Sequence, residues 1–494
     1  MTMKESRREF LKRSGGCALG MVTLATQMQH FGLMSALAQK SMDASPQGAG
    51  SDYKALVVIF FSGGNDGNNM VIPNHNDATI SNYNVYANLR SNLAVAQNTL
   101  LPITVPAMGG LTYGLHPNLG PVAGQPNNGI HELWAQQKMA IVTNVGTLVR
   151  PTTKAQMSQS SHPKPYQLYS HSDQVAQFQT SVSNTQAFTG WGGRLSDQMN
   201  LAHNPNGLIP MVTSIAGAQL FTSGQSSLPM AINDSNTSLA NVLNPSFTGT
   251  GAVARRTAWN NLRGLDLASN YIREASEVTD IAMAANTALQ SSQDTTQPFP
   301  NTGLGRQLRQ VARLIKSRTS LNVNRQVFYC QIGGFDTHSN QITVQANLFT
   351  TFSQAVRAFY AELVAQGIEN NVTTFTLSDF GRTMNPAGAG TTAVGSDHAW
   401  GNHMFVIGGS VLGGNFYGMN SVVNQTPYPN FVMGGLDDAD SGANARGRWI
   451  PTTSVEQYAA TIARWFGLPQ NAQTLESVFP NLDNFPVSNL GFMP

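Results

Sequence analysis

Five short runs of apolar, mostly β-branched or aromatic residues stand out along the chain. They span residues 55–61, 139–145, 327–332, 372–377 and 404–407, and glycine or asparagine bounds them. Their apolar residues are continuous instead of alternating, which is typical of strands buried on both faces of a parallel sheet. The pattern therefore predicts five strands of one mostly parallel sheet.

Between and after these runs, apolar residues recur every three or four positions, as they do on one face of an α-helix. One such pattern covers residues 344–363 and is stopped by Gly367, and another covers residues 305–317. A third follows the helix-capping Ser454 and ends at Gly467. Helices that alternate with buried strands predict a doubly wound α/β fold.

Residues 214–302 interrupt this alternation with a polar segment that is poor in strand signals. We expect a cap or insertion there, with one or two helices within residues 258–285. The α/β domain as a whole is predicted to span residues 52–494.

The first 38 residues have the pattern of a twin-arginine export signal. Arg7 and Arg8 precede a weakly apolar stretch, and residues 36–38 (Ala-Leu-Ala) supply a small-residue cleavage site. A lipid anchor on Cys17 is disfavoured because Ser-Gly-Gly precedes it instead of a leucine-led motif. We therefore expect the twin-arginine translocation machinery as a partner and a periplasmic or secreted location.

The composition of the chain argues against a nucleic-acid ligand, a membrane span and a disulfide. Charged residues make up 11% of the chain and the formal net charge is +2, which argues against nucleic acid as a ligand. No stretch after the signal reaches the roughly eighteen continuous apolar residues of a membrane span, so none is predicted in the mature chain. After cleavage Cys330 is the remaining cysteine, so an intrachain disulfide is excluded.

Acidic and histidine side chains collect at the ends of the predicted strands. In an open parallel sheet, ligands bind beyond the carboxyl ends of the strands. Carboxylates crowded there would repel one another unless a divalent cation were bound. The candidate metal ligands, in a chain with only 26 acidic residues, are Asp66, Asp336, His338, Asp379, Asp397, His398 and His403. Zinc, manganese, iron, calcium and magnesium all remain open as the cation, and a purely structural ion or polar cluster is the alternative.

Several motifs together resemble, over nearly the whole chain, the bacterial family called domain of unknown function 1501. That family looks distantly related to alkaline phosphatases and sulfatases, so the resemblance implies an alkaline phosphatase-like fold. The matching motifs lie at residues 63–67 (GGNDG), 114–117 (GLHP), 170–174 (SHSDQ), 190–194 (GWGGR), 335–338 (FDTH), 379–383 (DFGRT) and 397–398 (DH).

The resemblance implies roles for individual residues. Asp66 resembles the metal ligand after the first strand, Asp336 with His338 resembles a second ligand group, and His398 resembles the last metal-binding histidine. Asp379 stands where an Asp-His dipeptide is expected, but Phe380 replaces the histidine. One metal ion or two therefore remain open.

The superfamily also places a nucleophile at the start of a helix, and Ser170 fits this place, with Ser172 as a rival and an ordinary helix cap as the alternative. Arg382 is the candidate to clamp an anion. His116 and Arg194 are expected to be structural. The chain lacks the Cys-x-Pro-x-Arg motif of formylglycine sulfatases.

These features predict an exported, metal-dependent hydrolase of phosphate or sulfate esters. Attack by Ser170 or by metal-bound water is the expected chemistry, and an anionic small molecule or glycan is the expected substrate. The alternative is a non-catalytic periplasmic binding or assembly protein on the same fold, with a structural metal or none.

Overall fold

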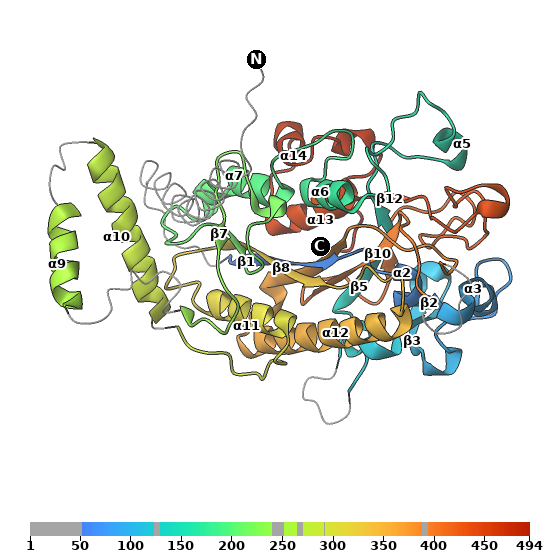
Figure 1. The fold of residues 1–494 in the computed structure, drawn as a ribbon, viewed down its shortest axis with the longest axis horizontal. Coiled ribbons are helices and arrows are strands. Elements are labelled where there is room, and N and C mark those ends of the chain that lie inside the picture. The colour runs from blue at the N-terminus through green and yellow to red at the C-terminus, as the bar shows by residue number, and fades with distance from the viewer. Residues whose placement is uncertain (1–51, 123–128, 240–250, 264–269, 291, 388–393) are drawn as a thin grey trace, which may run out of the picture.

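The computed structural model describes residues 52–122, 129–239, 251–263, 270–290, 292–387 and 394–494. The predicted export signal at residues 1–38, with Cys17, lies outside these residues. Within them the chain folds around one large sheet, which is covered by helices on both faces (Figure 1).

The five predicted strands are all present in this sheet. They are β1 (Lys54–Ser62), β5 (Met139–Gly146), β8 (Arg325–Gly333), β9 (Val372–Ser378) and β10 (Asn402–Gly408). Short strands that the sequence did not predict extend the sheet at its edges: β6 (Val212–Ser214), β7 (Met230–Ala231), β11 (Phe416–Tyr417) and β12 (Thr453–Ser454). The strand order is β11-β5-β10-β9-β1-β8-β6-β7, and β12 pairs with β5.

Strand direction decides which residues share an edge of the sheet. β1 pairs parallel with both β8 and β9, and β8 pairs parallel with β6. β10 is the exception, because it runs antiparallel to β9 and to β5. The residues that precede β10 therefore lie at the same edge as the residues that follow β1, β8 and β9.

Two helical layers bury the two faces of the sheet. Side chains of β1 alternate between them: Val57, Ile59 and Phe61 pack in one core cluster, and Val58 and Phe60 in the other. The first face is covered by α11 (Gly303–Lys316) and α12 (Gln341–Ala365), as two of the apolar patterns predicted. The second face is covered by α6 (His171–Thr180), α7 (Trp191–His203), α13 (Val455–Phe466) and α14 (Ala472–Val478) (Figure 1).

Local signals set the ends of α13. Ser454 and Gln457 form a reciprocal capping box at its start, and Gly467 ends it with a φ of 114°. Such a φ suits glycine because it has no Cβ. The sequence predicted this helix and both of its ends.

A smaller antiparallel sheet and short helices complete the body. The sheet has the order β2-β4-β3 and consists of β2 (Val71–Pro73), β3 (Leu101–Val105) and β4 (Leu111–Leu115). Four short helices also belong to the body: α2 (Gly67–Met70), α3 (Tyr83–Arg90), α4 (Glu132–Ala135) and α5 (Lys154–Met157).

The predicted insertion at residues 214–302 holds two helices, α9 (Ala252–Arg263) and α10 (Asn270–Gln290). They project from one end of the molecule, beyond the edge strand β7 (Figure 1). The last turns of α10 return to the body, where Ala285 and Leu289 are buried in the core. The segment also supplies β7 to the main sheet, so its first part is continuous with the α/β body.

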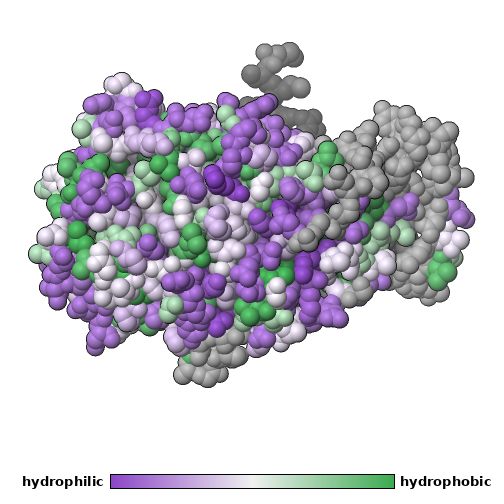
Figure 2. Space-filling view, turned by 180° about the vertical axis from the view of Figure 1, so that it is seen from behind, coloured by the Kyte–Doolittle hydropathy of each residue, from purple (hydrophilic) through white to green (hydrophobic). Residues whose placement is uncertain are grey.

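Among the residues that the structure describes, no helix is both long and apolar enough to cross a membrane. Hydrophilic side chains are interspersed with small groups of hydrophobic ones on the face shown in Figure 2.

One buried carboxyl group gives the fold a pH dependence that can be tested. Burial raises the pKa of Glu456, on α13, to about 8 from the 4.5 of an exposed glutamate. The folded chain then holds a proton that the unfolded chain releases. Stability should therefore fall as the pH rises from about 4.5 to about 8, by about 1 kcal/mol per pH unit.

We expect Glu456→Gln to remove this part of the pH dependence, which urea unfolding near pH 5 and near pH 8 would measure. Glu476→Gln is the matched control, because Glu476 is exposed on α14. Equal pH slopes for E456Q and E476Q would contradict the assignment.

Candidate metal centre

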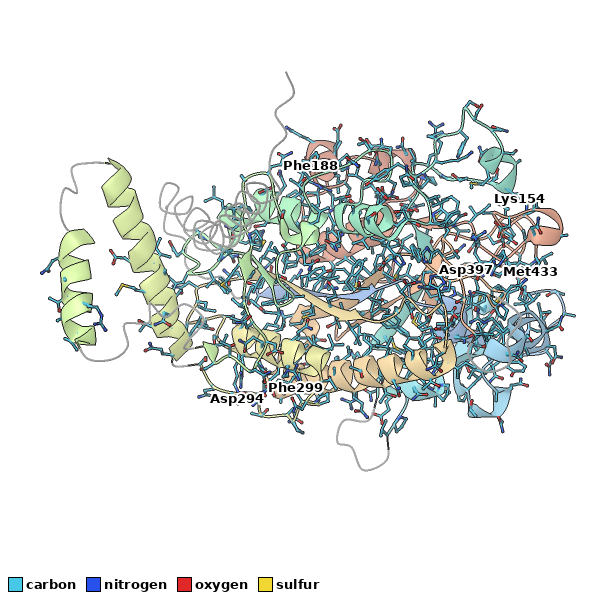
Figure 3. The ribbon with its side chains drawn as sticks, viewed as in Figure 1. Lys154, Phe188, Asp294, Phe299, Asp397 and Met433 are labelled. Carbon is cyan, nitrogen blue, oxygen red and sulfur yellow. The ribbon has the colours of Figure 1, made fainter. Side chains whose placement is uncertain are left out.

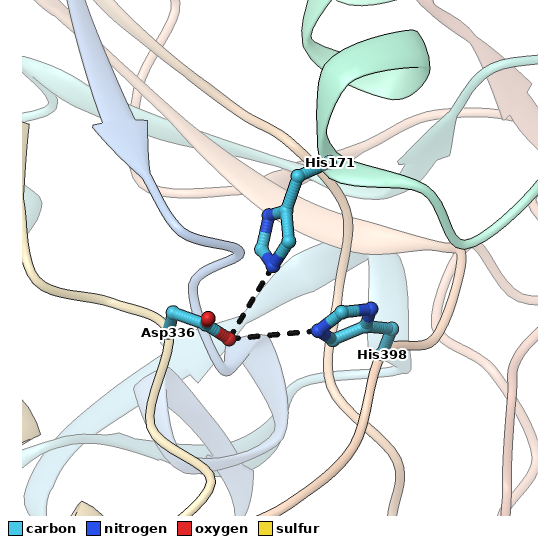
Figure 4. A group of neighbouring side chains, drawn as sticks. All are labelled: His171, Asp336 and His398. Carbon is cyan, nitrogen blue, oxygen red and sulfur yellow. Dashed lines mark ion pairs between the residues drawn. The ribbon is translucent and has the colours of Figure 1, made fainter.

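Four loops meet at the edge of the sheet where β1, β8 and β9 end. Asp336 and His338 follow β8, Asp379 follows β9, and His398 precedes the antiparallel β10. The fourth loop leads from α5 into α6, whose first residue is His171. Close-up Figure 4 shows His171, Asp336 and His398 pointing toward one another from three different segments.

Three imidazole nitrogens surround one carboxylate oxygen. Asp336 Oδ1 lies 3.4 Å from His171 Nε2, 3.1 Å from His338 Nε2 and 3.5 Å from His398 Nε2. Ligand atoms held about 2.0–2.1 Å from one tetrahedral cation would be roughly 3.3 Å apart. The three separations from Asp336 Oδ1 are close to this spacing, and the ligand atoms of His171, Asp336 and His398 all lie within 4.8 Å of one another, so this group could hold a metal ion.

Each histidine is oriented through its other nitrogen. The Nδ1 atom of His171 lies 2.7 Å from Asp379 Oδ2, that of His338 lies 3.3 Å from Asp397 Oδ1, and that of His398 lies 2.9 Å from the Tyr169 carbonyl oxygen. These acceptors require a proton on Nδ1, so in the neutral form of each ring Nε2 carries a lone pair. Metal-binding histidines are held in this way by carboxylates and carbonyls.

Facing Nε2 atoms can share a proton or bind a cation between them. His338 Nε2 and His398 Nε2 are 2.9 Å apart, and both also face Asp336. His171 Nε2 is buried and has no hydrogen-bond partner among the described residues. A cation bound by these nitrogens and the Asp336 carboxylate would satisfy all of them. Three imidazoles and one carboxylate suit zinc or manganese better than calcium or magnesium.

Charge in the surroundings keeps Asp336 ionised. Burial by itself would raise its pKa, but the hydrogen bond from Arg382 and the charges of Arg382, His171 and His338 bring the pKa below its usual value. The Asp336 side chain is 49% exposed, so this ligand faces solvent. The hydrogen bond to Asp379 raises the pKa of His171.

Phe380, at the position where the resemblance implied a histidine, forms one wall of the cluster. Its ring centre lies 4.7 Å from that of His171 and 4.6 Å from that of His398. It therefore packs against two candidate ligands and supplies no ligand atom.

Arg382 has a different role from the predicted anion clamp. Its side chain is fully buried, and its guanidinium donates to the carbonyl oxygens of Gly63, Gly64, Phe335 and Ser396. It also donates to Asp336 Oδ1 at 2.5 Å. With its donors used inside the protein, Arg382 positions Asp336 instead of meeting an anion.

Asp66 and His403, both predicted as ligands, are engaged elsewhere. The carboxylate of Asp66 pairs with Arg90 and accepts hydrogen bonds from Gln341 and from the Asn68 amide. His403 is buried, its ring stacks 5.0 Å from that of Tyr428, and burial lowers its pKa to about 3. Neither belongs to the cluster.

Asp379 and Asp397 take part in the centre as supports for histidines instead of as ligands. Asp379 accepts from the Gly63 amide at 2.9 Å with Oδ1 and from His171 with Oδ2, so both of its oxygens are used. Asp397 faces His338 with Oδ1 and pairs with Arg446 at 2.8 Å through Oδ2.

Sequence reasoning missed His171. The motif at residues 170–174 was recognised, but Ser170 was singled out because a nucleophile was expected at a helix start. Ser170 occupies the N-cap position of α6 but makes no side-chain capping hydrogen bond; its Oγ donates instead to Asp173 Oδ2 at 2.5 Å. The signal that could have found His171 was its place beside Ser170, at the end of a loop that returns to the sheet edge.

The hydrogen bond between His171 Nδ1 and Asp379 leads to a testable prediction. Asp379→Asn would place an amide NH₂ against His171 Nδ1, which moves the ring proton to Nε2 and removes its lone pair from the cluster. We expect zinc affinity to fall roughly 10- to 100-fold, measured by competition with a chelator. Asp173→Asn is the control, since Asp173 accepts from Ser170 and Ser172 and touches no candidate ligand. Unchanged affinity in D379N would count against the centre.

Several solved structures share a low level of similarity with this fold. The PsFucS1 sulfatase from Pseudoalteromonas sp. matches at 9% identity, with 78% coverage of this chain, 68% coverage of the other chain and a TM-score of 0.23. A protein in the alkaline phosphatase superfamily from Vibrio parahaemolyticus matches at 12% identity, 77% and 69% coverage and a TM-score of 0.26. The C-terminal periplasmic domain of EcEptC from Escherichia coli, in complex with Zn, matches at 12% identity, 74% and 77% coverage and a TM-score of 0.22.

With TM-scores this low, these likenesses carry no argument about activity. A search of curated proteins found no match to the sequence. A family model, in contrast, matches residues 53–432, which is more than half of the chain. The chain therefore belongs to the family described as protein of unknown function DUF1501.

Proposed function

We propose that this protein is an exported hydrolase of phosphate or sulfate esters that depends on a divalent transition-metal ion. The observation that carries the proposal is the convergence of three Nδ1-anchored histidines on the Asp336 carboxylate. A histidine that served only packing would not need its Nε2 aimed at two others and at a carboxylate. The motifs that the chain shares with DUF1501, and the resemblance of that family to alkaline phosphatases and sulfatases, add to this support.

The residues that would hold the metal are Asp336, His171, His338 and His398. A bound cation there would stabilise the negative charge that develops on the oxygens of an ester during its cleavage. The chain's own contribution is to keep each imidazole in the ligating tautomer and to keep Asp336 ionised. Because Asp336 is about half exposed, an ester can reach this centre from solvent.

Ser170 is the proposed nucleophile. It lies directly before His171, and Asp173 accepts the hydrogen bond of its hydroxyl group. In the proposed step the hydroxyl proton passes to Asp173, Ser170 Oγ bonds to phosphorus or sulfur, and the bond to the alcohol oxygen breaks. Asp173 then gives this proton to the departing alcohol oxygen, and a water molecule hydrolyses the seryl ester: its hydroxyl bonds to phosphorus or sulfur and its proton returns to Ser170 Oγ.

An anionic ester also needs a cation that it can reach. The side chain of Arg446 is 30% exposed and pairs with Asp397, which also faces His338, so its guanidinium can take this place. Arg382 cannot, because its side chain is buried beneath the cluster.

Metal analysis and enzyme assay test the proposal together. We expect purified mature protein to carry close to one zinc or manganese ion per chain and to hydrolyse aryl phosphates or aryl sulfates. His171→Ala and Asp336→Asn should each lose most of the metal and at least about a hundredfold of the activity.

His131→Gln provides the matched control. His131 precedes β5, at the opposite edge of the sheet, and its Nε2 lies 3.0 Å from the Pro102 carbonyl oxygen. Metal bound in the parent and lost in D336N, without hydrolysis by the parent, would leave a structural ion on a binding protein. Full metal content in both His171→Ala and Asp336→Asn would contradict the proposal.

Export is tested separately. We expect replacement of Arg7 and Arg8 by lysine to block export, because the twin-arginine machinery reads the arginine pair. Fractionation should then find the precursor in the cytoplasm, whereas Lys4→Arg, a basic exchange outside the pair, should leave export unchanged. Normal export of the double-lysine variant would mean that another route is used.

A further inference from the structure

We propose that Arg448 is a positioning residue for His398, one of the candidate metal ligands, and that it fixes the direction in which the His398 imidazole presents Nε2 to the cluster. The contacts involved are present in the chain itself, without a metal ion. The consequence for metal binding rests on the proposed function, and the experiment separates the two.

A single hydrogen bond to a neutral acceptor orients the His398 ring. Its Nδ1 lies 2.9 Å from the carbonyl oxygen of Tyr169, whereas the Nδ1 atoms of the other two histidines in the cluster face carboxylates. A carbonyl oxygen is a weaker acceptor than a carboxylate. Tyr169 also has a φ of 72°, which is uncommon for a bulky residue. The orientation of His398 therefore depends on further contacts that hold the two residues together.

Arg448 contacts both partners of this hydrogen bond. Its Nε donates to the His398 carbonyl oxygen at 2.9 Å, so it holds the main chain from which the imidazole extends. Its Cζ lies 5.0 Å from the centre of the Tyr169 ring, within the range of a cation–π contact. One side chain thus links the donor residue to the acceptor residue and restrains the distance between them.

The guanidinium of Arg448 is itself held in place. Nη1 donates to both carboxylate oxygens of Asp440, at 2.9 and 3.2 Å, and the two side chains are 23% and 18% exposed. The main chain of Asp440 is fixed in turn, because its carbonyl oxygen accepts from Lys154. Figure 3 shows Lys154 and Asp397, the residue before His398, at the same end of the molecule.

A salt bridge that served only stability would need neither of the contacts with His398 and Tyr169. A lysine in place of Arg448 could still pair with Asp440. Its one ammonium group lacks the planar fork of a guanidinium, so it could not pair with the carboxylate, donate to a carbonyl oxygen and lie against a ring at the same time. The positioning role therefore requires arginine.

The first measurement uses the mature protein without metal. Nitrogen NMR of protein with isotope-labelled histidine reports which ring nitrogen carries the proton, at about pH 8, where imidazole is neutral. We expect the Nδ1–H form of His398 to dominate in the parent. In Arg448→Met we expect the Nε2–H form of His398 to rise to at least roughly a third of the molecules.

Arg448→Lys covers the case in which Arg448→Met fails to fold. It keeps a positive charge beside Asp440, and we expect the same change in the His398 signals. Arg306→Met is the matched control, because Arg306, on α11, also pairs with an aspartate, Asp234, and is 29% exposed. It should leave the His398 signals as they are in the parent.

The second measurement is zinc affinity, by competition with a chelator. We expect Arg448→Met to lower the affinity roughly tenfold in the parent. In the His398→Ala background the same change should lower it by less than about twofold, because its effect passes through His398. Arg306→Met should leave the affinity unchanged in both backgrounds.

Unchanged His398 signals in R448M and R448K would overturn the proposal, whatever the protein binds. Equal losses of zinc affinity in the parent and in H398A would also overturn it, since Arg448 would then act on the fold as a whole. Altered His398 signals in a protein that binds no zinc would support the positioning role and refute the proposed metal-dependent function.

Discussion

A buried guanidinium holds the functional edge of this protein together. Arg382 donates to carbonyl oxygens in the loop after β1, in the loop after β8 and in the segment before β10, and it also binds the Asp336 carboxylate. Burying a cation is costly unless its donors are all satisfied. Here backbone carbonyl oxygens accept from the guanidinium, so its donors stay satisfied only while all of these loops keep their positions. The position of Asp336, and with it the spacing of the histidines, depends on this one side chain.

A second buried network, around Asp66, also links the loops of the candidate centre. Asp66 pairs with Arg90, whose guanidinium also donates to the Thr383 carbonyl oxygen, and Asp66 accepts from Gln341 at the start of α12. Gln341 in turn accepts from Ser396, two residues before His398. A buried ion pair of this kind gives little net stability but leaves an unpaired charge if one partner is lost. Its contribution here is to fix the relative positions of loops that carry the candidate ligands.

The candidate centre combines buried supporting groups with exposed candidate ligands. Asp379, Tyr169 and Phe380 lie behind the histidines and set their tautomers and ring planes, while Asp336 and His338 are about half exposed. Tyr169 adopts a φ of 72°, which is uncommon for a bulky side chain and directs its carbonyl oxygen to His398. Rigid support behind and open ligands in front are what a centre that meets a soluble ester requires.

The sequence by itself determined the five main strands, the helices α11, α12 and α13 and the fold class, because burial on both faces leaves a continuous apolar run and one-sided burial leaves a helical period. It also located Asp336, His338 and His398 at strand ends. It could not determine which carboxylates bind a metal and which bind an arginine or a histidine, since Asp66, Asp379 and Asp336 have similar glycine-rich surroundings.

Only the tertiary structure decided that β10 runs against its neighbours, which brings His398 to the edge where β8 and β9 end. It likewise brought His171, far away in the chain, to Asp336. The direction of a strand and the place to which a loop brings a residue depend on contacts between distant segments, and local patterns of residues do not carry that information.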